Sequence, residues 1–340
     1  MTRDSDVPHD VHHTAAPPLS NWLVRWQIQT VSPPKLYGNA RQQVAVVITL
    51  EPRRDETITD DELESLKLVL RRDDGTFDDV PMDDTLDALW FASGVQNHYQ
   101  YYPETQIGIP VCEDGGALPG AVRTKRFYVQ TRARAGTSMQ LWSRITHQVP
   151  EGDKYEYISD GSQQGFNSSI TLGSVTIPTY NAPADYTFDR RLVGGQENSD
   201  LFIWEYSIAP AHALYPEVAF LSAQATTQGM IQWATFSATQ TRAGHAGFAA
   251  PANATIHYNN AIVLGPNFVP VAKTRDLPGG WVTVVLQGGN NIPFHPASAH
   301  SHKGPMVIQA IDHYGNEHVL RVRFESELPT GRANLVLSRA

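Results

Sequence analysis

The chain has 340 residues, of which 41% are apolar and 18% charged, and its formal net charge at pH 7 is −9. This acidic balance argues against nucleic acid as the main partner, because phosphate binding requires a basic surface. One cysteine excludes an internal disulfide framework and a cysteine-rich metal site, and the length favours two domains.

The first 20 residues are rich in Pro, Asp and His, and we expect them to form a flexible arm. They contain no apolar run of signal-peptide length, and no run of about 18 apolar residues occurs along the chain. We therefore expect a protein that is made in the cytoplasm without a signal peptide or transmembrane segment. Release from the cell or association with a particle would fit this pattern.

Most of the remaining sequence alternates between apolar and polar residues and is rich in β-branched side chains, which is typical of strands. Strands are predicted at residues 43–50, 66–70, 126–132, 139–148, 169–177, 201–208, 229–239, 281–287, 306–311 and 318–324. Gly, Pro and Asn separate these segments, as in β-sandwiches and β-barrels. Trp22 and Trp26 are predicted to anchor the first strand in the core.

Helix is expected only as short turns within strand connections. Thr59 is followed three residues later by Glu62, which is the pattern of a capping box, and acidic residues fill the first turn. A helix of one or two turns is therefore predicted within residues 59–66. A second short turn is considered at residues 83–89.

Two segments resemble the bacterial immunoglobulin-like domains. In Lys35–Leu50, a Tyr-Gly-Asn turn at 37–39 precedes a long alternating strand, and in Ile308–Phe324 the same tripeptide at 314–316 follows Asp312 in a hairpin pattern. Together they cover about a tenth of the chain. The resemblance implies a sandwich fold with no activity attached to it.

We predict an all-β protein with two immunoglobulin-like β-sandwich domains, at residues 21–180 and 181–340, behind the arm at 1–20. Charge is distributed unevenly between them, since residues 201–270 contain only Glu205, Glu217 and Arg242 as charged side chains. Such a segment either belongs to a large buried core with neutral loops or forms a subunit interface or recognition surface.

Five histidines lie between residues 295 and 318, and His300 and His302 would face the same side of a strand. This His-x-His pattern is similar to the metal site of cupin barrels, but the carboxylate and the second histidine motif of those barrels are missing. His300 and His302 are therefore the candidate metal ligands, with pH sensing or interface packing as the alternative.

A second candidate site is aromatic. Tyr99, Tyr101 and Tyr102 lie in a polar loop, and tyrosine offers a large rigid contact area with a polar tip, as binding loops favour. These tyrosines, or Trp233, would also suit stacking on a sugar ring. Ordinary strand packing would explain the alternation of Tyr99 and Tyr101 equally well.

No nucleophile elbow, zinc-protease motif or phosphate-binding loop occurs in the sequence, so no catalytic residue and no cofactor is predicted. We predict a non-enzymatic structural or recognition protein that acts through surface contacts, as a subunit of a larger assembly or particle. Its partner would be a second copy or another protein. The alternatives are a carbohydrate-binding module, a metal-dependent enzyme and a secreted host-directed toxin that uses residues 219–241 as a pore-forming hairpin.

Overall fold

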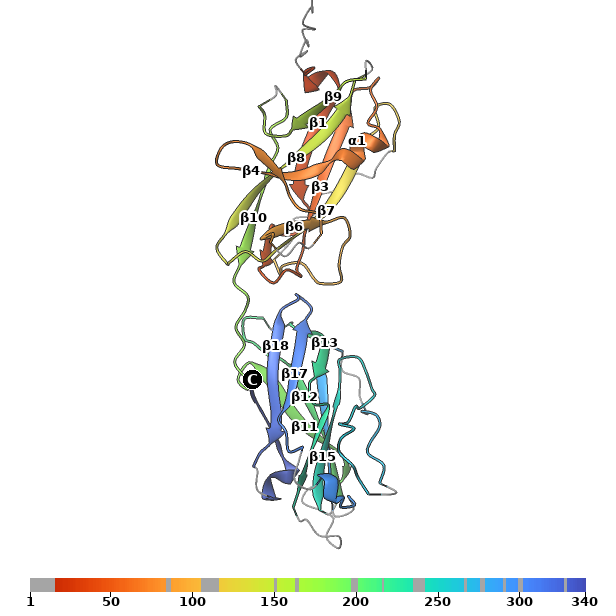
Figure 1. Cartoon of the computed structure of the whole chain (residues 1–340), viewed down its shortest axis with the longest axis vertical. Coiled ribbons are helices and arrows are strands. Elements are labelled where there is room, and N and C mark those ends of the chain that lie inside the picture. Colours follow the sequence, from red (N-terminus) through yellow and green to blue (C-terminus); the bar gives the residue numbers. More distant parts are fainter. Residues whose placement is uncertain are drawn as a thin grey trace, which may run out of the picture. The chain divides into compact units, whose positions relative to one another are not determined.

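The computed structural model of the chain forms two compact units, Met1–Thr176 (unit 1) and Ile177–Ala340 (unit 2) (Figure 1). Each unit is built from two β-sheets, so the fold is all-β, as predicted. The structure describes residues 16–83, 87–104, 116–149, 152–162, 165–196, 201–215, 217–234, 242–265, 268–275, 279–289, 292–298, 302–326 and 329–340.

Unit 1 contains a four-stranded sheet in the order β1-β3-β7-β6 and a six-stranded sheet in the order β2-β10-β8-β4-β5, with β9 paired to β8. Its elements are η1 (Leu19–Asn21), β1 (Leu23–Thr30), β2 (Lys35–Tyr37), β3 (Val44–Pro52), α1 (Asp60–Ser65), β4 (Lys67–Arg71), β5 (Phe77–Asp79), β6 (Trp90–Ser93), β7 (Arg123–Thr131), β8 (Ser138–Gln148), β9 (Lys154–Ile158) and β10 (Ile170–Val175). The strands pair antiparallel except for β2 and β10, which are parallel.

One apolar core lies between the two sheets of unit 1, and Trp22 and Trp26 are buried in it, as predicted. The core also includes Leu19, which is 2% exposed, and the Tyr157 hydroxyl donates a hydrogen bond of 2.9 Å to the carbonyl of Pro17. The arm predicted at residues 1–20 is thus too long at its C-terminal end, because residues 17–20 pack on the sandwich. Residues 1–15 lie outside the described residues.

Unit 2 pairs a five-stranded sheet in the order β11-β12-β16-β15-β14 with a four-stranded sheet in the order β13-β17-β18-β19. Its elements are β11 (Tyr186–Gly195), β12 (Leu201–Pro210), β13 (Phe220–Ala225), β14 (Gly229–Trp233), β15 (Ala243–Ala249), β16 (Val282–Gly289), η2 (Pro296–Ser298), β17 (Met306–Asp312), β18 (Glu317–Phe324), η3 (Pro329–Ala333) and β19 (Leu335–Arg339). In the described part of residues 219–241, the stretch considered as a pore-forming hairpin, β13 pairs with β17 and β14 pairs with β15, so the two strands belong to different sheets. Residues 235–241 lie outside the described residues.

Strands β14, β15 and β16 of the five-stranded sheet of unit 2 are buried on both faces, whereas β11 has exposed residues. One face packs against the four-stranded sheet, and the other is covered by the long connection after β15, through side chains such as Ile256, Tyr258 and Ile262. Every residue of β14, β15 and β16 is consequently buried. Burial on two faces excludes charged side chains, so it accounts for much of the missing charge between residues 201 and 270.

The structure confirms the predicted capping box and the predicted hairpin turn, and it shows the hydrogen bonds that form each of them. Thr59 and Glu62 form a capping box at the start of α1. In the hairpin between β17 and β18, the buried Asp312 carboxylate accepts the amides of Tyr314 and Asn316 at 2.9 Å each, and Gly315 has a φ of +85°.

Candidate functional site

Residues 94–104, the tyrosine loop, follow β6 in unit 1 and are held by buried amide side chains. The Asn97 side chain donates to the carbonyl of Arg41 at 2.6 Å, and Gln42 donates to the carbonyl of Gln100 at 3.1 Å. Gln43 accepts the backbone amide of Asn97 at 2.9 Å. Because Gln42 and Gln43 are fully buried, these bonds fix the loop on the sandwich.

The three predicted tyrosines are half-buried in this loop. Tyr102 packs edge-on against the buried Tyr37, with 5.4 Å between ring centroids, and Tyr99 lies 4.2 Å from the exposed ring of His98. Burial raises the pKa of the Tyr101 phenol, which therefore stays neutral as a hydrogen-bonding group. The structure places all three on one anchored loop, and their role in binding remains a prediction.

Trp233 is the sequence-predicted binding residue that the structure contradicts. It is 2% exposed and its ring packs against Phe294 under the cover of the five-stranded sheet. A ring enclosed in this way has no face on which a sugar could stack. Its neighbour His245 is also buried and stacks on Tyr258, with ring centroids 4.7 Å apart.

The two histidines predicted as metal ligands do not form a described site. His300 lies outside the described residues. His302 has a φ of +69° and uses its backbone carbonyl to accept the amide of Ile231 at 2.8 Å, which ties its loop to β14. Within the described ranges, no group of three His, Cys, Asp or Glu side chains is arranged to hold a metal ion.

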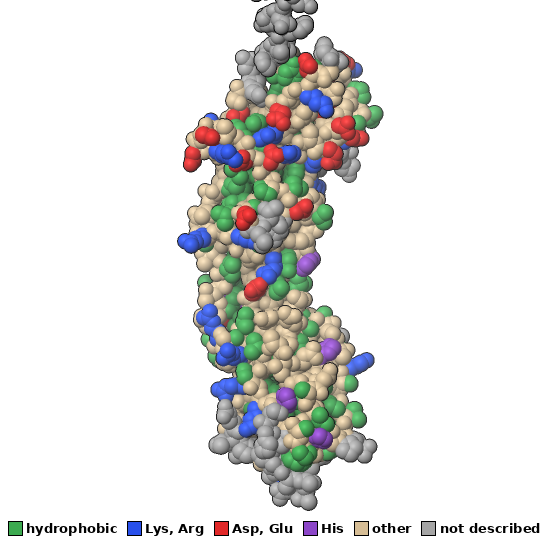
Figure 2. Space-filling view, in the orientation of Figure 1, with side chains coloured by type: hydrophobic (Ala, Val, Ile, Leu, Met, Phe, Trp, Pro, Cys, Tyr) green, Lys and Arg blue, Asp and Glu red, His purple; other side chains and the backbone are tan. Residues whose placement is uncertain are grey.

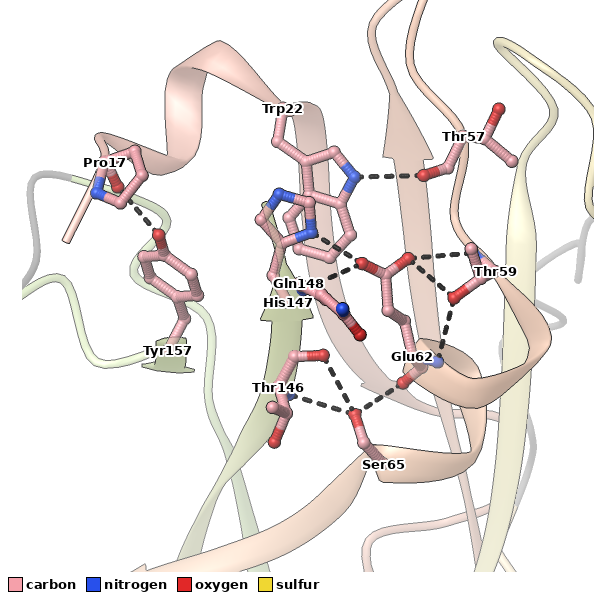
Figure 3. Close-up of polar contacts among 10 residues, drawn as sticks. All are labelled: Pro17, Trp22, Thr57, Thr59, Glu62, Ser65, Thr146, His147, Gln148 and Tyr157. Carbon is pink, nitrogen blue, oxygen red and sulfur yellow. Dashed lines mark hydrogen bonds and ion pairs between the residues drawn. The ribbon is translucent and has the colours of Figure 1, made fainter. Parts of the chain in front are cut away.

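Unit 1 contains a cavity of about 560 Å³ beside α1, which we call the Glu62 cavity. Its walls come from the segment before β1, the connection between β3 and α1, and the end of β8 (Figure 3). The lining residues are Pro17, Pro18, Leu19, Asn21, Trp22, Asp55, Glu56, Thr57, Thr59, Glu62, His147, Gln148, Val149 and Tyr157.

Glu62 is a buried carboxylate with both oxygens engaged. One oxygen accepts the Thr59 amide at 2.8 Å and its hydroxyl at 3.0 Å, while the other accepts His147 Nδ1 at 2.6 Å and the Gln148 amide at 3.3 Å (Figure 3). Burial alone would raise the pKa of Glu62, but the hydrogen bonds and charge of His147 and the bonds of Thr59 outweigh it. The pKa therefore lies below its ordinary value, and the group is ionised at neutral pH.

The ionised Glu62 fixes the position of the His147 ring. Because a carboxylate can only accept, Nδ1 of His147 carries a proton and donates it to Glu62. The ring is also stacked on Trp22, with centroids 3.8 Å apart and planes 16° apart. This arrangement holds one imidazole nitrogen in a fixed place in the cavity wall.

Sequence reasoning identified only half of this site. The capping box located Glu62, but as a helix cap, and Trp22 was expected in the core. His147 gave no signal, because it lies 85 residues from Glu62 in the chain and is brought to it by the pairing of β4 with β8.

Comparisons with known proteins leave the family open. No family model and no curated protein matches the chain. Among solved structures, a marsupial T cell receptor is similar at 11% identity over 91% of this chain and 97% of that one, with a TM-score of 0.23. The collagen adhesin from S. aureus is similar at 8% identity, over 90% and 92%, with a TM-score of 0.19.

The collagen binding domain of the Erysipelothrix rhusiopathiae surface protein RspB is similar at 10% identity, over 95% of this chain and 98% of that one, with a TM-score of 0.18. The fold is therefore assigned from the sheets themselves, and these likenesses carry no functional argument. No helix in the described part of the chain is long and apolar enough to cross a membrane.

Proposed function

We propose that the protein is a non-enzymatic structural or recognition protein that acts through surface contacts, as a subunit of a larger assembly. The observation that supports this most strongly is the edge strand β13 of unit 2. Its residues lie in the charge-poor stretch, yet they are not covered as β14 to β16 are: Leu221 is 41% exposed, and Ser222 and Gln224 are also exposed.

Exposed sheet edges normally carry a device that prevents pairing with other chains, such as a charge, a bulge or a cover. Most edge strands of the two units carry charged side chains. These strands and their charged residues are β1 with Arg25, β2 with Lys35, β5 with Asp78 and Asp79, β9 with Lys154 and Glu156, β11 with Asp189, Arg190 and Arg191, and β19 with Arg339. The edge of β6 is covered by residues 81–83, and β14 is buried. Residues 219–228 around β13 contain neither a charge nor a proline, and the one irregularity in its pairing with β17, between Phe220 and Ser222, lies at the start of the strand, before residues 223–225.

The backbone of β13 offers hydrogen-bonding groups on its open side. The Thr226 amide donates to the carbonyl of Val307 in β17 at 2.9 Å. Because bonding alternates along an antiparallel pair, the backbone amides and carbonyls of Gln224 and Ser222 also face β17. The amides and carbonyls of Ala223 and Ala225 consequently face away from it. Toward the start of the strand, the Phe220 amide is already used by the carbonyl of Gly280 at 2.9 Å.

A second copy of β13 is the partner that fits this edge. Two copies related by a twofold axis would pair antiparallel and join their four-stranded sheets into one. Like charges directly opposite each other destabilise such a pair, and β13 has none.

The test compares the mass of the wild-type protein with that of three variants by sedimentation velocity. Ala223→Pro removes an amide that faces away from β17, so its own sheet should tolerate it while pairing between copies is lost. Ser222→Lys should weaken association by placing like charges near the axis, more so at low salt, whereas Ser222→Ala should leave the mass unchanged. Wild-type mass in both Ala223→Pro and Ser222→Lys would overturn the assignment to β13.

Carbohydrate recognition is the second candidate, and the anchored tyrosine loop is what favours it. Half-exposed rings on a fixed loop lose little entropy on binding, as a sugar site requires. A glycan array should then show binding that Tyr99→Ala reduces. Equal binding by wild type and Tyr99→Ala, or none by either, would remove this candidate.

A further inference from the structure

We propose that unit 2 binds a neutral sugar in a cavity of about 280 Å³, which we call the Trp281 cavity. It lies over β11, β12 and the start of β16, on the face of the five-stranded sheet that is turned away from the four-stranded sheet. None of the described residues between 250 and 275 lines it. The tyrosine loop is in unit 1 and β13 is in the other sheet, so this proposal can fail separately from both.

Three polar side chains form a row across the floor of the cavity. Asp189 in β11 lies directly opposite Ser207 in β12, and Ser207 lies directly opposite Thr283 in β16. Their chain neighbours Tyr206 and Val282 pack toward the four-stranded sheet, so the row faces the other way. Neighbouring strands are about 5 Å apart, and the cavity floor therefore presents a carboxylate and two hydroxyls over about 10 Å.

The polar groups of this row have no partner in the protein. Neither the Asp189 carboxylate nor the hydroxyls of Ser207 and Thr283 make a hydrogen bond or an ion pair with any described residue. Thr283 carries most weight, because it is only 6% exposed and buried hydroxyls normally find a partner. Since Thr283 lines the cavity, a ligand bound there would supply this partner.

Trp281 provides an aromatic surface beside the row. It precedes Thr283 by two residues and so lies on the same face of the sheet, where it is half-buried and lines the cavity. Its ring packs on no other aromatic ring of the described residues, and its indole N–H has no hydrogen-bond partner among them. A sugar ring can place its C–H groups on an indole while its hydroxyls, which both donate and accept, reach the polar row.

The charges of the wall balance. Glu205 has a side chain that is 7% exposed, and its carboxylate accepts Arg191 at 3.3 Å and the Arg275 amide at 2.8 Å. With Asp189 and Arg190, the wall contains two acidic and two basic side chains. Such a wall favours neither anions nor cations, so a neutral sugar suits it better than a phosphate-bearing ligand.

The experiment applies the full-length protein to an array of neutral oligosaccharides. The sugar that binds best is then titrated into the protein while the indole N–H of Trp281 is followed by NMR, and loss of this signal in Trp281→Phe identifies it. We expect a saturable shift of the Trp281 signal. The proposal is overturned if no neutral sugar binds, or if the bound sugar leaves this signal unchanged.

The test variant Ser207→Ala/Thr283→Val removes two hydroxyls of the row and keeps the shape of the site. The control Ser338→Ala/Thr171→Val makes the same changes in β19 and β10, outside the cavity. The test variant should weaken sugar binding at least about fivefold and the control less than twofold, with thermal unfolding unchanged in both. Equal binding by the two variants would overturn the proposal. Loss of binding in Tyr99→Ala with full binding by the test variant would also overturn it, because the sugar would then lie at the tyrosine loop.

Discussion

His245, in the inner strand β15 of the five-stranded sheet, has two buried polar atoms, its ring nitrogens, without a hydrogen-bond partner in the described part of the chain. It is 2% exposed, and burial lowers its pKa to about 4. The ring is therefore neutral in the folded protein at neutral pH. Its ring stacks on that of Tyr258 in the covering connection.

This makes unit 2 sensitive to acid. The unfolded chain protonates His245 near pH 6.5 and the folded chain only near 4, so the unfolding free energy falls as the pH drops between these values. The loss amounts to about 3 kcal/mol at most. Urea unfolding at pH 7, 5.5 and 4.5 should show a smaller loss for His245→Phe than for wild type. Equal losses would mean that His245 does not titrate in this way.

Glu62 has the opposite pH dependence. Its pKa is lowered on folding, so its contribution is present above pH 4.5 and is lost as the pH falls through the folded pKa. Glu62→Gln keeps a capping residue but loses the charge opposite His147. We expect its unfolding free energy at pH 7 to be lower by about 1–3 kcal/mol, with the gap from wild type narrowing at pH 3.

Glu64→Gln is the control for this measurement. It removes the same charge from the same helix, but the Glu64 side chain is 81% exposed and makes only a surface ion pair with Lys125 at 3.2 Å. The expected change is within about 0.5 kcal/mol. A Glu62→Gln variant as stable as Glu64→Gln would contradict the structural role of the Glu62 network.

At the scale of elements, glycine in β15 sets how closely the covering connection approaches the sheet. A Cβ on Gly247 would lie 2.5 Å from Ile256 and 2.6 Å from the ring of Tyr258. Gly247→Ala should therefore displace the cover and lower the unfolding free energy by about 1–3 kcal/mol. Gly173→Ala in β10, where a Cβ meets nothing within 4 Å, should have a much smaller effect on thermal unfolding.

The same strand shows why sequence patterns found some elements and missed others. In β18, exposed and buried residues alternate throughout, so period two is visible and the strand was predicted. In β15, all seven residues are buried and five of them are Gly or Ala, so neither alternation nor β-propensity marks the strand. The Glu62 cavity was missed for a related reason, because strand pairing and not local sequence brings His147 to Glu62.

At the scale of the whole molecule, the two units differ in their net charge. Unit 1 has 16 Lys and Arg against 24 Asp and Glu, and unit 2 has 10 against 11. Charged side chains crowd the visible face of unit 1, with both signs interspersed over the end that bears α1 and β9 (Figure 2). Unit 1 is therefore net acidic, whereas unit 2 is nearly neutral.

Each unit has its own apolar core, so each should fold without the other. Residues 177–340 expressed alone are expected to unfold cooperatively in urea, with near-ultraviolet circular dichroism signals from the buried aromatic rings. A fragment that shows no cooperative transition would mean that unit 2 depends on unit 1 for its stability.

We propose that this protein works by contact and associates through the open edge of unit 2. Light scattering on a size-exclusion column, over a range of protein concentrations and with electron microscopy of the same peak, tests this association most directly. We expect a mass above that of the 37.6 kDa chain, in a dimer or a larger discrete assembly, that decreases on dilution. A mass equal to that of one chain at every concentration would contradict it.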